Sequence, residues 1–319
     1  MPISGSNDSA KQLSNFAVDI CWGAWSELGV SGWGRSHRDW VIDPEPLIVA
    51  TSSLSRKDSR LRDESMDWCI RNWRHISQTR LRNVLRSNQD SMSDLWGTYA
   101  ATINSRAGIR WPYATEERSL YRVTGRSTLR DLAEPSLIVL RMRAIFGVGA
   151  RTEIMRHLLL ASDSRFTAAE LSNAIGFAKR NVSEECDLLA QAGLLRVVTQ
   201  GNRFYYSLDK RRNLASFVGR AATIAPDWSA LFRVIHAIMS LTEITAEYSS
   251  EVQFVETHQA LLRIEADLKT LGIEGPPKIR TTEMLDSWLT WASGIMGSMA
   301  CGKWPEPQEV MQASNQTNV

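Results

Sequence analysis

The central part of the chain carries the local pattern that most restricts its fold. Thr167 and Glu170 have the spacing of a capping box, in which each side chain satisfies an amide donor of the first helical turn. Gly176 follows this helix and permits a tight turn into a second amphipathic segment. Gly201 and Asn202 then join two β-rich runs, which is a two-residue hairpin signal. The pattern predicts helix, turn, helix and hairpin.

Two further helical segments precede this pattern. Pro135 stands at a helix start, and Gly147 and Gly149 separate that helix from the segment RTEIMRHLLLASD, whose apolar residues have helical spacing. The order helix, helix, tight turn, helix and hairpin is that of a winged helix–turn–helix. The sequence therefore predicts a mainly α-helical protein with a central winged helix–turn–helix over residues 135–212.

The segment AELSNAIGFAKRNVSEECDLLAQAGLL resembles the core of winged-helix bacterial regulators of the arsenic-repressor and multiple-antibiotic-resistance kind. With the rest of the central segment, the resemblance covers about a quarter of the chain. The resemblance implies a recognition helix in the major groove of DNA and a wing on the DNA backbone. The residues that match the family's pattern are Ala169, Glu170, Leu171, Ile175, Gly176, Val182, Ser183, Leu189, Ala192, Gly193 and Leu194. The residues then expected to contact DNA are Lys179, Arg180, Asn181 and Ser183 in the groove, and Asn202 and Arg203 on the backbone.

Two positions depart from this family's pattern. Ala178 stands where a capping serine is usual, and its absence removes roughly 1 kcal/mol of helix-cap free energy. Glu184 and Glu185 follow Ser183, where a basic residue is common. These two carboxylates would lie near DNA phosphates in the expected complex.

Residues 1–134 are expected to form a mostly helical, tryptophan-rich domain that ends in an arginine-rich connector. Eight of the twelve tryptophans lie between residues 22 and 111, and we interpret them as rigid aromatic packing rather than a ligand cage. Residues 71–86 contain no acidic residue, so a helix–turn–helix with a second helix over 77–86 is one interpretation and a solvated helix face is the other. The candidate second basic surface comprises Arg74, Arg80, Arg82 and Arg86.

Residues 213–319 are expected to be helical, with a frayed tail after residue 304. One segment has a broad apolar face, which indicates a dimer contact or a docking surface for a partner protein. Core packing within the chain is the competing interpretation. The residues of this face are Leu231, Ile235, Ile238 and Met239.

Charge and cysteine usage indicate the partner and the compartment. The formal net charge is only +2, but residues 135–212 hold 12 Lys and Arg against 7 Asp and Glu, which favours an anionic partner. The four cysteines show no paired spacing, so we expect reduced thiols, no disulfide and no metal site. No apolar run is long enough for a membrane span and no secretion signal is visible, so we expect a cytoplasmic protein.

No arrangement of nucleophile, base or paired carboxylates indicates an enzyme. The segment GSMACGKW at 297–304 matches a phosphate-binding loop, but prolines follow it and Trp304 replaces the required hydroxyl residue. We therefore expect a cofactor-free transcription regulator, a repressor that binds double-stranded DNA as a homodimer. The alternative is a protein-interaction module, such as an antitoxin or adaptor, that docks on a partner protein.

Overall fold

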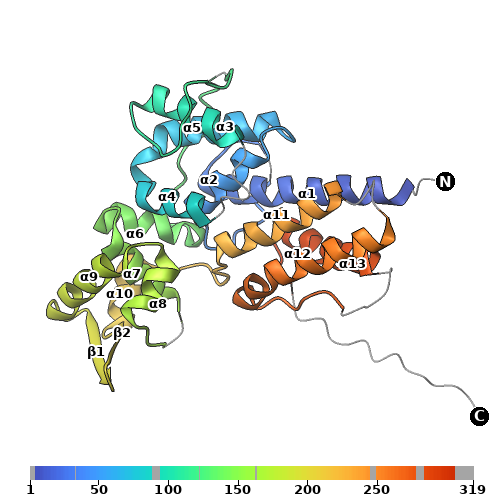
Figure 1. Ribbon diagram of the computed structural model, residues 1–319. Coiled ribbons are helices and arrows are strands. Elements are labelled where there is room, and N and C mark those ends of the chain that lie inside the picture. Colours follow the sequence, from blue (N-terminus) through green and yellow to red (C-terminus); the bar gives the residue numbers. More distant parts are fainter. Residues whose placement is uncertain are drawn as a thin grey trace, which may run out of the picture.

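The computed structural model describes residues 4–32, 34–87, 94–121, 123–161, 164–244, 249–277 and 284–305. Within these ranges the chain is mainly α-helical and contains one two-stranded antiparallel sheet, as the sequence predicts (Figure 1). The α-helices are α1 (Ser4–Leu28), α2 (Pro44–Ser53), α3 (Ser59–Asn72), α4 (Gln78–Ser87), α5 (Asp94–Ala107), α6 (Ile138–Phe146), α7 (Ala150–Leu160), α8 (Ala168–Ile175), α9 (Lys179–Gln191), α10 (Arg211–Val218), α11 (Trp228–Ile244), α12 (Ser250–Leu271) and α13 (Met284–Ala300). The strands are β1 (Leu195–Gln200) and β2 (Arg203–Leu208), and the short 3-10 helices are η1 (Trp73–His75) and η3 (Pro135–Leu137).

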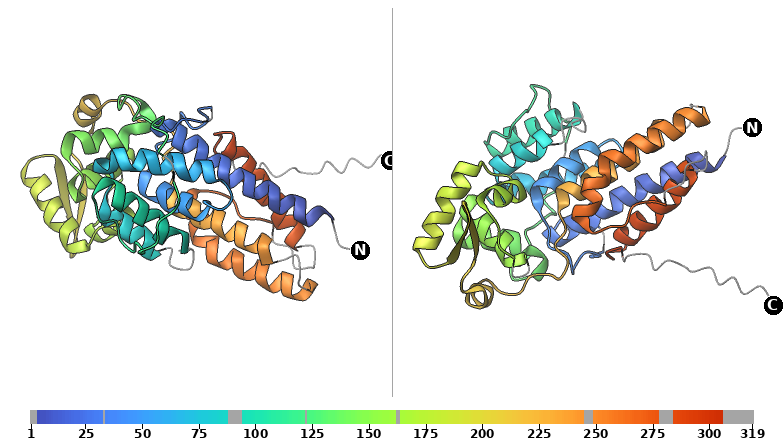
Figure 2. Two further views of the ribbon diagram at one scale, coloured as in Figure 1. Left: turned by 90° about the horizontal axis from the view of Figure 1, so that it is seen from above. Right: turned by 60° about the horizontal axis from the view of Figure 1, so that its bottom comes forward.

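The first five helices and the last three share one hydrophobic core. Helix α1 packs against α13 and α11, α11 packs against α12 and α2, and α12 packs against α13. Figures 1 and 2 show α1, α11, α12 and α13 side by side as a bundle next to the α2–α5 helices. Segments from the two ends of the sequence therefore bury their apolar faces against each other.

Six tryptophans of the N-terminal segment are buried in this core, which agrees with the packing interpretation, whereas Trp73 of η1 is only partly buried and lies outside the core: the six are Trp22, Trp25, Trp40, Trp68, Trp96 and Trp111. Trp25 and Trp68 are fully buried and contact edge to face, with ring centroids 5.5 Å apart. The indole N–H of Trp25 donates to Thr51 Oγ1 at 2.7 Å, and that of Trp68 donates to the Leu28 carbonyl at 2.9 Å. Each ring is thus held by both packing and a directed hydrogen bond. Trp33 lies outside the described residues.

The broad apolar face of α11 is core of this chain rather than a free surface. Leu231, Ile235 and Ile238 are buried among the residues of the shared core, and Met239 is partly buried against it. The packing alternative is therefore the one that the structure supports, and the inference of a dimer contact at this face was wrong.

Residues 138–218 close a second core of their own (Figure 1, green to yellow). Helix α9 packs against α7, α8 and β1, and α10 packs against α6 and α7. Val41, which precedes α2, enters this core from the N-terminal segment. The second core lies beside the first, and the two contact each other along α2, α4, α6 and η1.

Buried ion pairs join the two cores. Arg143 of α6 is fully buried and donates to Glu45 of α2 at 2.7 and 2.9 Å and to Glu153 of α7 at 2.8 Å. Arg80 of α4 is also buried, and donates to both Asp43 and Glu45 at 2.5 to 2.7 Å. With Arg156 on Glu153, the cluster pairs three guanidinium groups with three carboxylates. Because every buried charge has a partner, the cluster avoids the cost of an isolated charge.

The loop-like match at 297–304 is the end of a helix. Its first four residues belong to α13, and the chain then turns at Gly302 with φ 76°. The Gly302 carbonyl accepts the indole N–H of Trp40 at 2.8 Å, and a Cβ on Gly302 would lie 1.7 Å from the Ser36 carbonyl oxygen. The glycine therefore allows the backbone at residue 302 to pack directly against the backbone at Ser36.

Candidate nucleic-acid interface

Helix α8 begins at the capping box and ends at the glycine that the sequence indicates. The Thr167 backbone N–H donates to Glu170 Oε2 at 2.7 Å, and the Glu170 N–H donates to Thr167 Oγ1 at 3.2 Å. The Thr167 hydroxyl also donates to Glu170 Oε2, at 2.9 Å, and the two bonds that Thr167 donates to this carboxylate hold the pKa of Glu170 below its usual value. Gly176 adopts the left-handed conformation with φ 68°, which ends the helix and turns the chain toward α9.

Helix α9 lies on the second core with one face and presents the others to solvent. Val182, Cys186 and Leu189 are buried, as their spacing predicts. Burial raises the pKa of the Cys186 thiol to about 12, so this cysteine is a protonated core residue at neutral pH. Ala178 precedes the helix without a side-chain cap hydrogen bond, as expected for alanine at this position.

The hairpin has the two-residue turn that the sequence predicts. Gln200 pairs with Arg203 across Gly201 and Asn202, and Gly201 has φ 59°. Strand β2 also pairs with Phe166 before α8, because Tyr206 and Phe166 exchange backbone hydrogen bonds of 2.8 and 3.0 Å. The hairpin is therefore anchored beside the start of α8.

A groove of about 470 Å³ separates α9 from the hairpin, and we call it the hairpin groove. It brings together four of the six residues that the sequence assigns to DNA contact: Lys179 and Ser183 from α9, and Asn202 and Arg203 from the hairpin. The start of α8 closes the groove with residues 167–170, and Phe204 and Tyr206 line it from β2.

A second groove of about 480 Å³ lies on another side of α9, and we call it the α4 groove. Asn181 and Glu185 of α9 line it, facing η1 and the start of α4. Residues 179 and 183 and residues 181 and 185 are each four apart, so each pair occupies its own face of the helix. The lining residues from η1 and α4 include Trp73, Arg74, Gln78 and Thr79.

Arg180, the remaining predicted contact, lies on the exposed ridge between these two faces. Its Nε donates to Glu184 Oε1 at 2.8 Å, and the two side chains are 90% and 62% exposed. An ion pair this exposed contributes little to stability and is easily exchanged for another partner. Arg180 is therefore accessible to an anion.

Three of the four arginines of the candidate second basic surface are exposed. Arg74, Arg82 and Arg86 face solvent, whereas Arg80 is buried in the ion cluster. Arg80 lies on the face of α4 that carries Leu81, Val84 and Leu85 into the protein. Its assignment to an exposed basic surface was therefore wrong. The sequence does not reveal this burial, because the carboxylates that neutralise Arg80 are distant along the chain.

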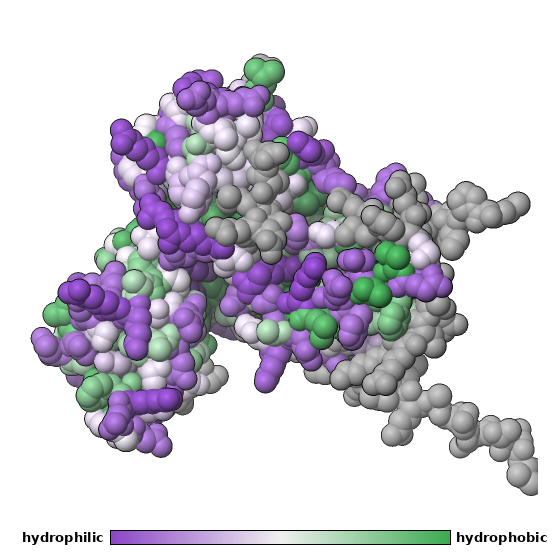
Figure 3. Space-filling view, in the orientation of Figure 1, coloured by the Kyte–Doolittle hydropathy of each residue, from purple (hydrophilic) through white to green (hydrophobic). Residues whose placement is uncertain are grey.

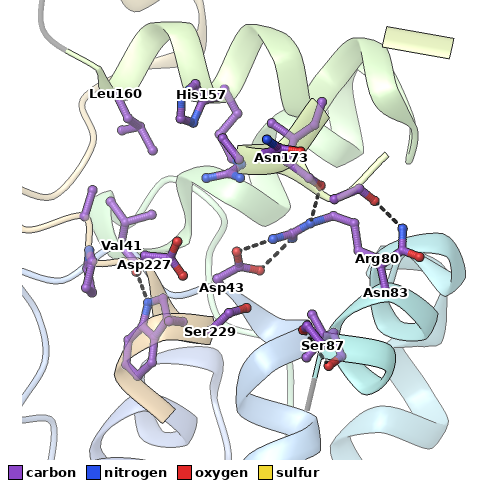
Figure 4. A pocket seen from close by; sticks show the side chains of 18 of the residues that line it. Val41, Asp43, Arg80, Asn83, Ser87, His157, Leu160, Asn173, Asp227 and Ser229 are labelled. Carbon is purple, nitrogen blue, oxygen red and sulfur yellow. Dashed lines mark hydrogen bonds and ion pairs between the residues drawn. The ribbon is translucent and has the colours of Figure 1, made fainter. Parts of the chain in front are cut away.

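Helix α4 also holds the turn that leads into α9. Arg80 Nε donates to the Ile175 carbonyl at 3.2 Å, and Asn83 Nδ2 donates to the Gly176 carbonyl at 2.6 Å. These two residues line a cavity of about 460 Å³ between α4, α7, α8 and the start of α11, in which Asp43, His157 and Asn173 also lie (Figure 4). The N-terminal helices thus fix the end of α8 from outside the second core.

Two residues of the interface had no clear signal in the sequence. Asn83 has the periodicity of an exposed helical residue, and only the fold places its amide on Gly176. Phe204 is 57% exposed and lines the hairpin groove on the same strand face as the buried Tyr206. The alternation of side chains along RFYYSL predicts that Phe204 and Tyr206 share one face of the strand, but it does not predict that Phe204 is exposed.

The surface around α9 and the hairpin is mostly hydrophilic, with separate apolar residues between the charged ones (Figure 3, lower left). The exposed apolar side chains of this part include Leu188, Leu194, Val197 and Phe204. Among the described residues no three His, Cys, Asp or Glu side chains are grouped as metal ligands. No described helix combines the length and apolar character needed to cross a membrane.

Comparison with known proteins adds no relative. No protein-family model, no curated protein and no solved structure matches this chain.

Proposed function

We propose that residues 135–212 form a winged helix–turn–helix that binds double-stranded DNA, with α9 as the recognition helix and the β1–β2 hairpin as the wing. The hairpin groove is the observation that carries this proposal, because it brings Lys179 and Ser183 of α9 opposite Asn202 and Arg203. The major groove of DNA admits an α-helix, and a hairpin beside that helix can reach the adjacent phosphates.

The exposed side chains at the start of α9 suit contacts to base edges. Lysine and arginine donate to guanine, and asparagine pairs with adenine through two hydrogen bonds. Lys179, Arg180 and Asn181 are all exposed in the first turn of α9. On this basis we infer a sequence-specific transcription regulator that represses by occupying its site.

The first experiment titrates the full chain into a fluorescent duplex library and measures anisotropy at several salt concentrations. Affinity should fall steeply as salt rises, because lysine and arginine release counterions when they contact phosphates. The variant Lys179→Ala/Arg180→Ala should bind its best duplex more weakly and keep its fold, since neither side chain is buried. Arg263→Ala is the matched control, because it removes an exposed cation from α12, outside both grooves.

The wing is tested separately with Arg203→Ala. One lost phosphate contact should weaken all duplexes nearly equally and reduce the salt slope by about one. A changed base preference would show that Arg203 reads bases. Parental affinity in the Lys179→Ala/Arg180→Ala variant would show that α9 is not the recognition helix.

The second candidate is a protein-interaction module of the antitoxin or adaptor kind. Three exposed apolar side chains favour it, because such residues are typical of protein interfaces: Leu188 of α9, Leu194 in the turn after α9, and Val197 of β1. Salt separates the two candidates. A protein contact through these side chains would persist at salt concentrations that abolish phosphate contacts.

A further inference from the structure

Helix α9 is flanked on two sides, and the hairpin accounts for only one of them. On the other side the α4 groove places η1 and the start of α4 next to Asn181 and Glu185. A helix in the major groove has a phosphate backbone on each side, so a protein surface beside either face of α9 can reach one of them. The N-terminal helices supply such a surface.

Arg74 is the cation among the described residues that line the α4 groove. Its guanidinium carbon lies 4.7 Å from the centroid of the Trp73 ring, a cation–π arrangement that holds the side chain without neutralising it. The side chain is exposed, and no carboxylate in the part of the chain described by the structure forms an ion pair with it. A preorganised arginine with open donors suits a phosphate.

The remaining charges of the α4 groove do not oppose an anion. Glu185 pairs with Arg151 at 2.9 Å, so its carboxylate is already neutralised. Gln78 and Thr79 are exposed at the start of α4 and add polar side chains of the type that contact phosphate oxygens. With Arg151 counted as the partner of Glu185, two arginines stand against one carboxylate at the α4 groove, and Arg74 is the one left to bind an anion.

We propose that the η1–α4 corner, with Arg74 as its main cation and Gln78 and Thr79 beside it, is a second phosphate-binding site of the DNA interface. It contacts the backbone on the side of α9 opposite to the wing. This inference rests on the proposed DNA-binding function. It assigns the N-terminal helical part a direct role in binding DNA, together with its role in holding the end of α8.

The test compares the full-length protein with Arg74→Ala and with Arg263→Ala, a matched control that removes an exposed arginine of α12 and lines neither groove. Both are titrated into a labelled duplex at several salt concentrations. One phosphate contact corresponds to a salt slope of about 0.9, which is roughly eightfold in affinity at 0.1 M salt. Arg74→Ala should lose about that much and Arg263→Ala should bind like the parent.

The double variant Arg74→Ala/Arg203→Ala tests whether the two sites are separate. Contacts on opposite sides of α9 should contribute independently, so the two losses should multiply and the salt slope should fall by about two. Parental affinity and salt slope in Arg74→Ala would overturn the second site while leaving the wing intact. A parent protein that binds no duplex would instead refute the DNA-binding function itself.

Discussion

A substitution at Arg80 tests whether this buried arginine of α4 contributes more to the stability of the protein than an exposed arginine of the same helix. The Arg80 guanidinium donates to Asp43 Oδ1 at 2.7 Å, to Asp43 Oδ2 at 2.5 Å and to Glu45 Oε2 at 2.6 Å. Its Nε donates to the Ile175 carbonyl. Arg80→Met keeps an unbranched side chain in the same space but leaves two buried carboxylates short of a cation. Removing one partner of a buried ion pair costs about 3–5 kcal/mol.

The assay is urea unfolding followed by circular dichroism at neutral pH. With a slope of about 3 kcal/mol per M, a loss of 3–5 kcal/mol moves the midpoint down by roughly 1–1.7 M. Arg82→Met is the matched control, and an exposed substitution of this kind should change stability by about 0.5 kcal/mol at most. Arg80→Lys should give an intermediate loss, because an ammonium group cannot reproduce the planar fork.

A charge-balancing variant checks that the carboxylates cause the loss. Arg80→Met/Asp43→Asn removes one charge of each sign, so its destabilisation should be smaller than the sum of the two single changes. Equal unfolding midpoints for Arg80→Met and Arg82→Met would refute the reasoning, since they would show that the ion pairs of Arg80 do not stabilise the folded protein.

Three further predictions concern stability and use the same unfolding assay. Thr167→Ala removes the capping box of α8 and should cost about 1 kcal/mol, whereas Ser216→Ala, an exposed change in α10, should cost almost nothing. Gly302→Ala should destabilise by at least 2 kcal/mol, since its Cβ would overlap the Ser36 carbonyl at a positive φ; a smaller effect would mean that the turn relaxes freely. Burial lowers the pKa of His157 to about 4, and although burial alone would raise the pKa of Glu153, Arg143 and Arg80 hold it at about 2. Both residues favour the folded state in their deprotonated forms, so stability should fall as the pH drops from about 6.5 to 4 through His157 and from about 4.5 to 2 through Glu153, and His157→Gln should flatten the upper part of that profile.

Features set by neighbouring residues could be predicted from the sequence. The capping box at Thr167, the left-handed Gly176 and the turn at Gly201 each depend on contacts within a few residues, and all three lie where the pattern indicates. The apolar spacing of α9 likewise gives its buried face. Lys179 and Arg203 could be assigned to one surface because the local order of helix and hairpin brings them together.

Features set by long-range contacts could not be predicted in this way. Arg80 has the sequence surroundings of a basic helix surface, and its carboxylate partners lie 35 and 37 residues away. The apolar face of α11 is equally compatible with a second copy or with a helix of the same chain until the position of α1 is known. The α4 groove joins residues about 100 positions apart, such as Arg74 and Asn181, so no local pattern indicates it.

The packing of α1 against α13 has a consequence for synthesis on the ribosome. The two helices are separated by about 250 residues, so at 5–20 residues per second α1 waits on the order of tens of seconds for its partner. Phe16, whose ring lies next to Gly297 of α13, remains uncovered on that side in the nascent chain during that interval, and exposed apolar surface of this kind is what chaperones bind. The 138–218 core needs little beyond its own segment and can close while the last helices are still being translated. A fragment that ends at residue 212 would stop in this half-covered state and would therefore aggregate.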